Sequence, residues 1–149
     1  MRIGIANDHR GVDAKEIISK YLIEKGYGVV NYGTDTKDAV DFPDYAYKLG
    51  KGVLNKEVDL GIAICGTGIG MSIALNKMKG IYCAKVSKES EAVLSKAHNN
   101  ANVIAISEET DKDLMLSIID KFVSTPFSNI DRYINRNNKI KDIEKKWLN

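Results

Sequence analysis

A short glycine-rich stretch decides how this chain folds: Ile64-Cys65-Gly66-Thr67-Gly68-Ile69-Gly70-Met71-Ser72. It follows the apolar run from Val58 to Ala63 and precedes a helix-like run from Ile73 to Lys77. A buried strand therefore ends in a turn that opens a helix. The backbone of a turn without large side chains wraps closely around a ligand, and its N–H groups point at that ligand. With the Cys65 thiol at its mouth, the turn predicts a place where negative charge is held while a bond changes.

The bulk composition is typical of a soluble globular protein. The 149 residues suit one domain with a sizeable core, and we expect a single domain over residues 1–149. The net charge of +2 is too small to indicate a nucleic-acid partner, and no apolar run approaches the roughly 18 residues of a membrane span. The N-terminal residues Met1 to Ala6 lack the apolar core of a signal peptide. We therefore expect a cytoplasmic protein with neither nucleic acid nor membrane as a partner.

The chain has two cysteines, Cys65 and Cys83, which are fewer than a disulfide framework in so short a chain normally uses. Cys83 stands in the strand-like run from Ile81 to Val86 and is interpreted as a small buried apolar residue. There is no CxxC or HxxxH spacing, and there are only two histidines. No metal site is expected.

Apolar runs alternate with amphipathic segments along the chain. We expect strands over residues 2–6, 27–32, 58–65, 81–86 and 103–106. We expect helices over residues 12–25, 43–54, 70–78, 89–97 and 111–123, a polar loop over 33–42, and a basic C-terminal helix over about 129–147. This alternation predicts a three-layer α/β domain whose parallel sheet is covered on both faces.

Two turns fall at one edge of this predicted sheet, where ligands of such folds bind. The first strand ends at Asn7 to Gly11, and the third ends at the Cys65 turn. If these strands are neighbours, Asp8, His9, Cys65 and Thr67 converge. Asp8 has an alternative role as the N-cap of the following helix, and His9 is equally explained as a surface residue at a helix start.

His98 and Asn99 follow the predicted helix over 89–97. In isolation they are typical of a helix C-terminus that is capped by an Asn in the left-handed conformation. This helix runs antiparallel to the strands, so its C-terminus lies at the opposite edge of the sheet from Cys65. A His98 that acts at Cys65 must therefore come from another subunit, which predicts a homo-oligomer with a shared site.

Together these motifs resemble the ribose-5-phosphate isomerase B family, which also includes isomerases of galactose 6-phosphate and allose 6-phosphate. The resemblance covers nearly the whole chain. It rests on Asp8-His9 with Gly11, on Asp41 to Ala46, on Ile64 to Gly70, on Asn76-Lys77, and on His98-Asn99 with Ala101 to Val103.

The resemblance implies an aldose–ketose isomerase of carbohydrate metabolism, in the pentose phosphate pathway, that needs neither metal nor organic cofactor. It implies a five-stranded Rossmann-like sheet and a homodimer or dimer of dimers with shared active sites. Its most concrete form converts D-ribose 5-phosphate to D-ribulose 5-phosphate through an enediolate. By motif position, Cys65 moves a proton between C2 and C1, and His98 of a second subunit opens the sugar ring with help from Asp8 or Thr67.

The resemblance also implies which residues bind the substrate. Backbone N–H groups of the stretch with Gly66, Gly68, Gly70 and Ser72 would hold the enediolate. The remaining positions assigned to substrate binding are His9, Asn99, Arg132 and Arg136, of which His9 and the two arginines would approach the phosphate. These residue types suit the chemistry. A positioned base contributes about 10²–10⁴-fold to rate, one oxyanion donor contributes roughly 3 kcal/mol, and the arginine fork matches a phosphate.

The chain departs from the family's pattern at the phosphate end. Glu109, preceded by Glu108, stands after the fifth strand where the family usually has an arginine that helps hold phosphate. Arg132 is kept, but Tyr133 replaces the usual histidine after it and a Gly pair before it is lost, while Phe42 replaces a usual tyrosine. The sugar therefore stays open, with galactose 6-phosphate and allose 6-phosphate as alternatives.

Two other functions are weighed against this one. The glycine-rich turn could belong to a nucleotide-binding module, but only Ile69 separates Gly68 from Gly70, and the turn follows the third strand rather than the first. The chain could also be a non-catalytic subunit of a two-chain isomerase. The presence of Cys65, Thr67 and His98 argues against that role.

Overall fold

The computed structural model describes residues 1–148; Asn149, the last residue of the predicted domain, lies outside them. The strands are β1 (Arg2–Asn7), β2 (Gly28–Asn31), β3 (Leu60–Cys65), β4 (Cys83–Lys85) and β5 (Val103–Ser107). The helices are the 3₁₀ turn η1 (His9–Gly11), α1 (Val12–Glu24), α2 (Phe42–Leu54), α3 (Ile69–Leu75), α4 (Glu89–Ala97), α5 (Lys112–Ser124) and α6 (Asp131–Trp147).

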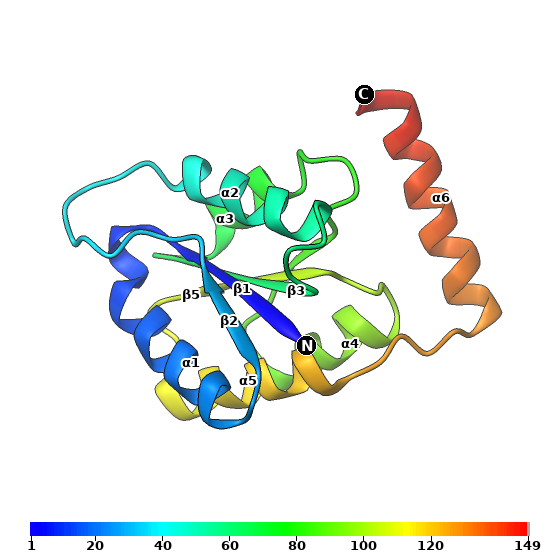
Figure 1. Ribbon diagram of the computed structural model, residues 1–149. Coiled ribbons are helices and arrows are strands. Elements are labelled where there is room, and N and C mark those ends of the chain that lie inside the picture. Colours follow the sequence, from blue (N-terminus) through cyan, green and yellow to red (C-terminus); the bar gives the residue numbers. More distant parts are fainter. Residues whose placement is uncertain (149) are drawn as a thin grey trace.

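The five strands form one sheet in the order β2-β1-β3-β5-β4, and every pair is parallel. The predicted Rossmann-like α/β fold with a five-stranded parallel sheet is confirmed. Helices α1, α4 and α5 cover one face of the sheet, and α2 and α3 cover the other (Figure 1). Every residue of the central strand β3 is buried, which explains why its sequence is apolar without alternation.

Side chains of β3 alternate between two apolar clusters. Ile62 and Ile64 pack with Ile18 of α1 on one face. Ala63 and Cys65 point to the other face, toward α2 and α3. The alternation places the Cys65 side chain beneath α3, the helix that its own turn opens.

The elements depart from their predicted bounds mainly around α3 and β4. Helix α3 ends at Leu75 rather than at residue 78, because the Asn76 side chain bonds to another element. Its Nδ2 donates to the carbonyl of Cys83 at 2.9 Å, and its Oδ1 accepts from the Cys83 N–H at 2.8 Å. The amide thus pairs with the edge strand β4 as a neighbouring strand would, which a helical period does not reveal.

The C-terminal helix α6 stands apart from the body of the domain (Figure 1). None of its residues is buried, and Ile143 and Trp147 are 61% and 79% exposed. No helix within residues 1–148 has the length and apolar character needed to cross a membrane.

Candidate active site

Strands β1 and β3 are neighbours, as the convergence of their turns requires. The N–H of Asp8 donates to the carbonyl of Ile64 at 3.2 Å, so the two turns begin side by side. Asp8, His9, Cys65 and Thr67 therefore lie at the same carboxyl edge of the sheet. We call the residues from Asp8 to Arg10 and from Cys65 to Gly70 the carboxyl-edge site.

The Cys65 thiol is the buried centre of this site. Its side chain is 4% exposed, and its Sγ accepts a hydrogen bond from the N–H of Gly68 at 3.1 Å. Such a donor stabilises a thiolate, the reactive form of cysteine. Among residues 1–148, the N–H groups of Gly66, Thr67, Gly70 and Met71 have no acceptor. A buried thiol thus lies in a turn with unpartnered backbone donors, an arrangement that can hold an oxyanion.

Two glycines give this turn its shape. Gly68 has a φ of +80°, and a Cβ there would lie 3.0 Å from the backbone carbon of Ile106. A Cβ on Gly70 would lie 2.6 Å from the ring of Phe42, so the aromatic ring of α2 packs directly on the start of α3. The hydroxyl that a tyrosine would carry at position 42 is therefore absent from a ring that lies directly beside the Cys65 turn.

Asp8 and His9 are fixed by backbone partners. Asp8 is 7% exposed, and its Oδ1 accepts from the N–H of Arg10 at 3.0 Å, so the predicted capping role is real and occupies one carboxylate oxygen. His9 Nδ1 accepts from the N–H of Val40 at 3.2 Å. Because an accepting ring nitrogen carries no proton, Nε2 holds it and can donate to an anion.

The loop that holds His9 is itself anchored. The buried Lys15 of α1 donates to the carbonyl of Thr34 at 2.6 Å and pairs with Asp35. The predicted polar loop over 33–42 is thus tied to α1 near its start, and it contacts His9 near its end through Val40. Burying a lysine costs free energy unless its charge is paired, so the contacts to Thr34 and Asp35 stabilise the buried Lys15 as well as the loop.

The structure places two other predicted residues with partners of their own. Thr67 is exposed, and its Oγ1 accepts from the N–H of Ile69 at 3.1 Å. The N–H of Ser72 donates to the carbonyl of Gly68 at 3.1 Å inside the helix, so this donor is already used. The Ser72 side chain lies against Cys83, whose pKa burial raises to about 12. Cys83 is only partly buried, yet it stays a neutral thiol that packs with the second apolar cluster.

Arg10 is the residue at this edge that the sequence patterns missed. Its Nη2 donates to Glu108 at 2.9 Å and to Glu109 at 3.4 Å, and the hydrogen bond to Glu108 is the main cause that raises the pKa of Arg10. Its Nη1 lies 3.3 Å from the place of a Cβ on Gly66. The guanidinium crosses over the glycine at the end of β3 to reach the loop after β5. The sequence signal that could have indicated this bridge is the arginine after β1 and the two glutamates after β5, because these two strands flank β3.

His98, Asn99, Arg132 and Arg136 lie at the other edge. Asn102, just before β5, accepts through its carbonyl from the N–H of Gly61 at the start of β3. The end of α4 therefore lies at the amino edge of the sheet, away from Cys65. One chain does not bring His98 to Cys65, as the antiparallel course of α4 predicts.

At this amino edge, the Tyr133 side chain contacts His98 and lies close to both arginines. Its ring stacks on His98 with centroids 4.1 Å apart and an angle of 19° between the planes. Arg132 Nη2 donates to the Tyr133 hydroxyl at 3.1 Å, and the guanidinium carbons of Arg132 and Arg136 lie 4.7 Å and 5.9 Å from its ring centre. We call His98, Asn99, Arg132, Tyr133 and Arg136 the amino-edge cluster.

No group of three or more His, Cys, Asp or Glu side chains in the described part of the chain is placed to hold a metal ion.

Known proteins similar to this chain share both its sequence and its fold. The Ribose/Galactose Isomerase family model matches residues 3–140. A probable ribose-5-phosphate isomerase B of Mycoplasma genitalium is 42% identical over 147 residues, which are 96% of this chain and 95% of that protein. The structure of Clostridium thermocellum ribose-5-phosphate isomerase B has a TM-score of 0.96 at 41% identity and covers 99% of both chains. The structure of the Mycoplasma genitalium protein with bound ribulose-5-phosphate has a TM-score of 0.91 at 40% identity and covers 97% of both chains.

Proposed function

The chain belongs to the ribose/galactose isomerase family, and on this premise we propose that it interconverts D-ribose 5-phosphate and D-ribulose 5-phosphate. One observation carries the proposal. The buried Cys65 Sγ, stabilised by the Gly68 N–H, lies in a turn whose remaining backbone donors are free to bind the substrate's oxygens. Isomerisation needs this combination, because a C–H next to a carbonyl is acidic only when the resulting charge is held.

The proposed reaction begins with the open-chain aldose. The Cys65 thiolate takes the proton from C2, a C1–C2 double bond forms, and the carbonyl electrons move to O1. The N–H groups of Gly66, Thr67 and Gly70 bind the resulting enediolate. The thiol then returns the proton to C1, while O2 loses its proton to O1 and becomes the new carbonyl. Protons and electrons balance within the sugar and the thiol, so the step needs no electron acceptor.

Ring opening requires the amino-edge cluster of a second copy of the chain. His98 would take the proton of the O1 hydroxyl and return one to the ring oxygen, with Asp8 or Thr67 assisting. The exposed Ile69 and Ile73 of α3, beside the Cys65 turn, offer an apolar face for the second copy. The exposed Ile140, Ile143 and Trp147 of α6 offer another. The proposal therefore includes a homodimer, or a dimer of dimers, whose active sites are shared between copies. It also places the protein in the cytoplasm.

The phosphate would be bound by His9 Nε2 of one copy and by Arg132 and Arg136 of the other, with Asn99 beside them. Arg10 adds a cation where Glu108 and Glu109 would otherwise repel the phosphate. One guanidinium against two carboxylates still leaves one net negative charge. The amino-edge arginines of the second copy therefore carry most of the attraction.

Ribose 5-phosphate is favoured over galactose 6-phosphate and allose 6-phosphate because the similar structures are ribose-5-phosphate isomerases, one of them with bound ribulose-5-phosphate. A nucleotide-binding role has less support, since the turn presents a thiol within an isomerase fold. A non-catalytic subunit is also less favoured, because Cys65 and His98 are both present.

The purified chain alone should be assayed by kcat/KM against ribose 5-phosphate, the two hexose phosphates and free ribose. We expect the highest value for ribose 5-phosphate and deuterium at C1 of the ketose when the reaction runs in D₂O. A higher value for a hexose phosphate would reassign the substrate. Activity only after addition of a second protein would identify the chain as an incomplete subunit.

A further inference from the structure

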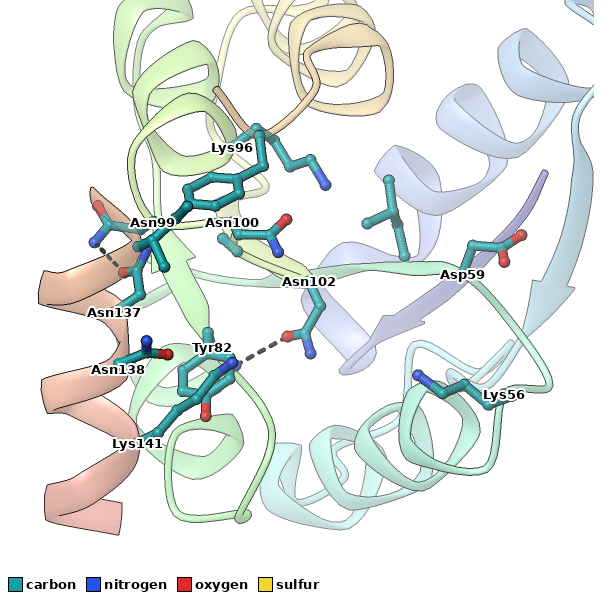
Figure 2. A pocket seen from close by; sticks show the side chains of 14 residues that line it. Lys56, Asp59, Tyr82, Lys96, Asn99, Asn100, Asn102, Asn137, Asn138 and Lys141 are labelled. Atoms are coloured by element: carbon teal, nitrogen blue, oxygen red, sulfur yellow. Dashed lines mark hydrogen bonds between the residues drawn. The ribbon is translucent and has the colours of Figure 1, made fainter. Parts of the chain in front are cut away.

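A second pocket lies at the amino edge, between the body of the domain and α6 (Figure 2). Its volume is about 340 Å³. The walls come from the segment before β3, the segment between α4 and β5, and the first part of α6. The pocket is at the opposite end of the sheet from Cys65, and the proposed proton transfer does not use it.

The pocket has an excess of positive charge. Lys56, Lys96 and Lys141 line it from three different segments (Figure 2). Within residues 1–148, none of the three ammonium groups forms an ion pair. Asp59 is the one lining residue with a carboxylate, and its Oδ2 already accepts from the N–H of Arg2 at 2.7 Å. Three cations around one small space favour an anion as its occupant.

Lys96 shows the cost of this arrangement. It is partly buried at the end of α4, and burial lowers the pKa of its ammonium group because less water surrounds the charge. An anion in the pocket would supply the missing countercharge and raise this pKa again. Within residues 1–148, the Lys96 ammonium group lies 5.8 Å from the centre of the Phe122 ring but has no carboxylate partner, so its countercharge is left for a ligand to supply.

Amide and apolar groups complete the pocket. The side chains of Asn100 and Asn138 line it and have no hydrogen bond to any residue in the range 1–148. An amide both donates and accepts, which suits hydroxyl groups. Phe127 and Ile134 add an apolar wall suited to a short carbon chain. Ammonium groups, amides and an apolar wall together fit a small phosphorylated polyol.

The pocket is connected to His98 by two hydrogen bonds. Asn137 Nδ2 donates to the carbonyl of His98 at 2.8 Å, and Asn99 Nδ2 donates to Asn137 Oδ1 at 3.2 Å. Both Asn137 and Asn99 also line the pocket, where their side chains lie close together (Figure 2). A ligand that binds the amide of Asn137 or Asn99 would therefore alter the hydrogen bond that holds the His98 carbonyl.

We propose that this pocket binds a small phosphorylated polyol, and that its occupation shifts His98 and thereby regulates ring opening at the shared site. The regulatory half rests on the proposed function, whereas the binding half does not.

The two histidines, His9 and His98, make an NMR test direct, because one His98→Gln variant assigns both ring signals. We would titrate the wild-type protein with glycerol 3-phosphate at constant ionic strength, with glycerol alone as a control. A saturable shift of the His98 signal is expected. In Lys56→Gln/Lys96→Gln, the same shift should need at least about tenfold more ligand, because two of the three positive charges that line the pocket are removed.

Lys139→Gln/Lys145→Gln is the matched control, because it removes two α6 lysines that do not line the pocket. It should keep the wild-type affinity. Lys56→Gln alone, at an exposed position, repeats the test if the double variant has a lowered thermal unfolding midpoint. An unchanged titration in the pocket variants would mean that the ligand binds elsewhere and would overturn the proposal.

Kinetics test the regulatory half. At saturating ribose 5-phosphate, glycerol 3-phosphate should change kcat of the wild type but not of Lys56→Gln/Lys96→Gln. Purely competitive inhibition would overturn this half. An inactive wild-type protein would count against the proposed function alone, since the NMR titration requires no turnover.

Discussion

The two edges of the sheet hold the two halves of the proposed site in different ways. At the carboxyl edge, Cys65 and Asp8 are buried, and backbone groups of β1, β3 and α3 fix their positions. At the amino edge, His98 lies at a helix end and stacks on Tyr133 of α6, a helix with no buried residue. Buried strands hold a reactive group accurately because neighbouring strands pack on both sides of them. An exposed helix such as α6 holds a side chain as accurately only when another surface packs against it.

The two edges therefore have different roles in the proposed mechanism. In that mechanism, one chain builds the proton-transferring half completely, whereas the half that opens the ring and holds the phosphate comes from a second copy. Substitutions at the carboxyl edge should therefore act on the chemical step. Substitutions at the amino edge should act through binding and assembly.

The strongest test of the carboxyl edge is Cys65→Ala. Loss of the base should lower kcat about 10³-fold, within the range that a positioned general base supplies. Cys83→Ala is the control, since the thiol of Cys83, whose pKa is about 12, stays neutral near pH 7 and takes no part. It should keep kcat within about twofold of the wild type. Equal losses in the two variants would remove Cys65 from its assigned role.

Mixed subunits test whether the two edges meet across an interface. Equal amounts of inactive Cys65→Ala and His98→Ala chains should regain about a quarter of wild-type activity, because half of the dimers are mixed and each has one intact site of two. A mixture of Cys65→Ala with Asp8→Asn should show no more activity than the Asp8→Asn chain supplies by itself, since both changes lie in the same half. If neither mixture recovers activity, despite chain exchange shown by mass spectrometry, His98 of one copy does not act at Cys65 of the other.

Gly68→Ala tests the precision of the turn. A Cβ at φ +80°, 3.0 Å from the Ile106 backbone, must shift the turn that holds Cys65. We expect kcat to fall roughly tenfold or more. Gly26→Ala is the control, with a φ of +91° and open space around its Cβ. Gly26→Ala should lower the free energy of unfolding by about 1–2 kcal/mol and leave kcat unchanged.

In urea unfolding, Gly68→Ala should lose about 1 kcal/mol more than Gly26→Ala because of the added crowding. Similar stability losses with full activity in both variants would show that the turn tolerates displacement. The carboxyl edge would then be less rigid than the comparison assumes.

The smallest expected effect is at Tyr133. Removal of its ring in Tyr133→Ala takes away the stack on His98 and the support of Arg132, and kcat/KM should fall about two- to tenfold. Tyr133→Phe keeps the stack and loses only the hydroxyl that accepts from Arg132. If Tyr133→Phe is as impaired as Tyr133→Ala, the hydroxyl rather than the stacked ring positions the cluster.

Much of the fold was predictable from local patterns. The βα alternation gave the parallel sheet, and helix α4 was predicted with the observed bounds because its N-terminal and C-terminal signals are both local. The bounds of α3 and β4 were not predictable in this way, since the Asn76 side chain bonds to Cys83 on another element. The thiol in its glycine-rich turn was visible as a motif, and the structure shows which of its N–H groups are already used.

The residues found only from the structure act between segments that are distant in sequence. Arg10 meets Glu108 and Glu109 nearly one hundred residues later, and it does so across a glycine. In the sequence, Tyr133 is marked only by its departure from a family pattern, whereas in the structure its ring stacks on His98. A sequence shows each charge and ring, but not which of them the chain folds together.

The sequence by itself determined the order of strands and helices, the buried strand that leads into Cys65, and the edge at which each candidate residue falls. These follow from the side-chain periods of helices and strands and from the fixed direction of βα units. The tertiary structure decided the partners: the donor on the Cys65 sulfur, the bridge from Arg10, the ring beneath His98 and the lysine-lined pocket behind it. Such partners depend on distances between separate elements, which packing sets.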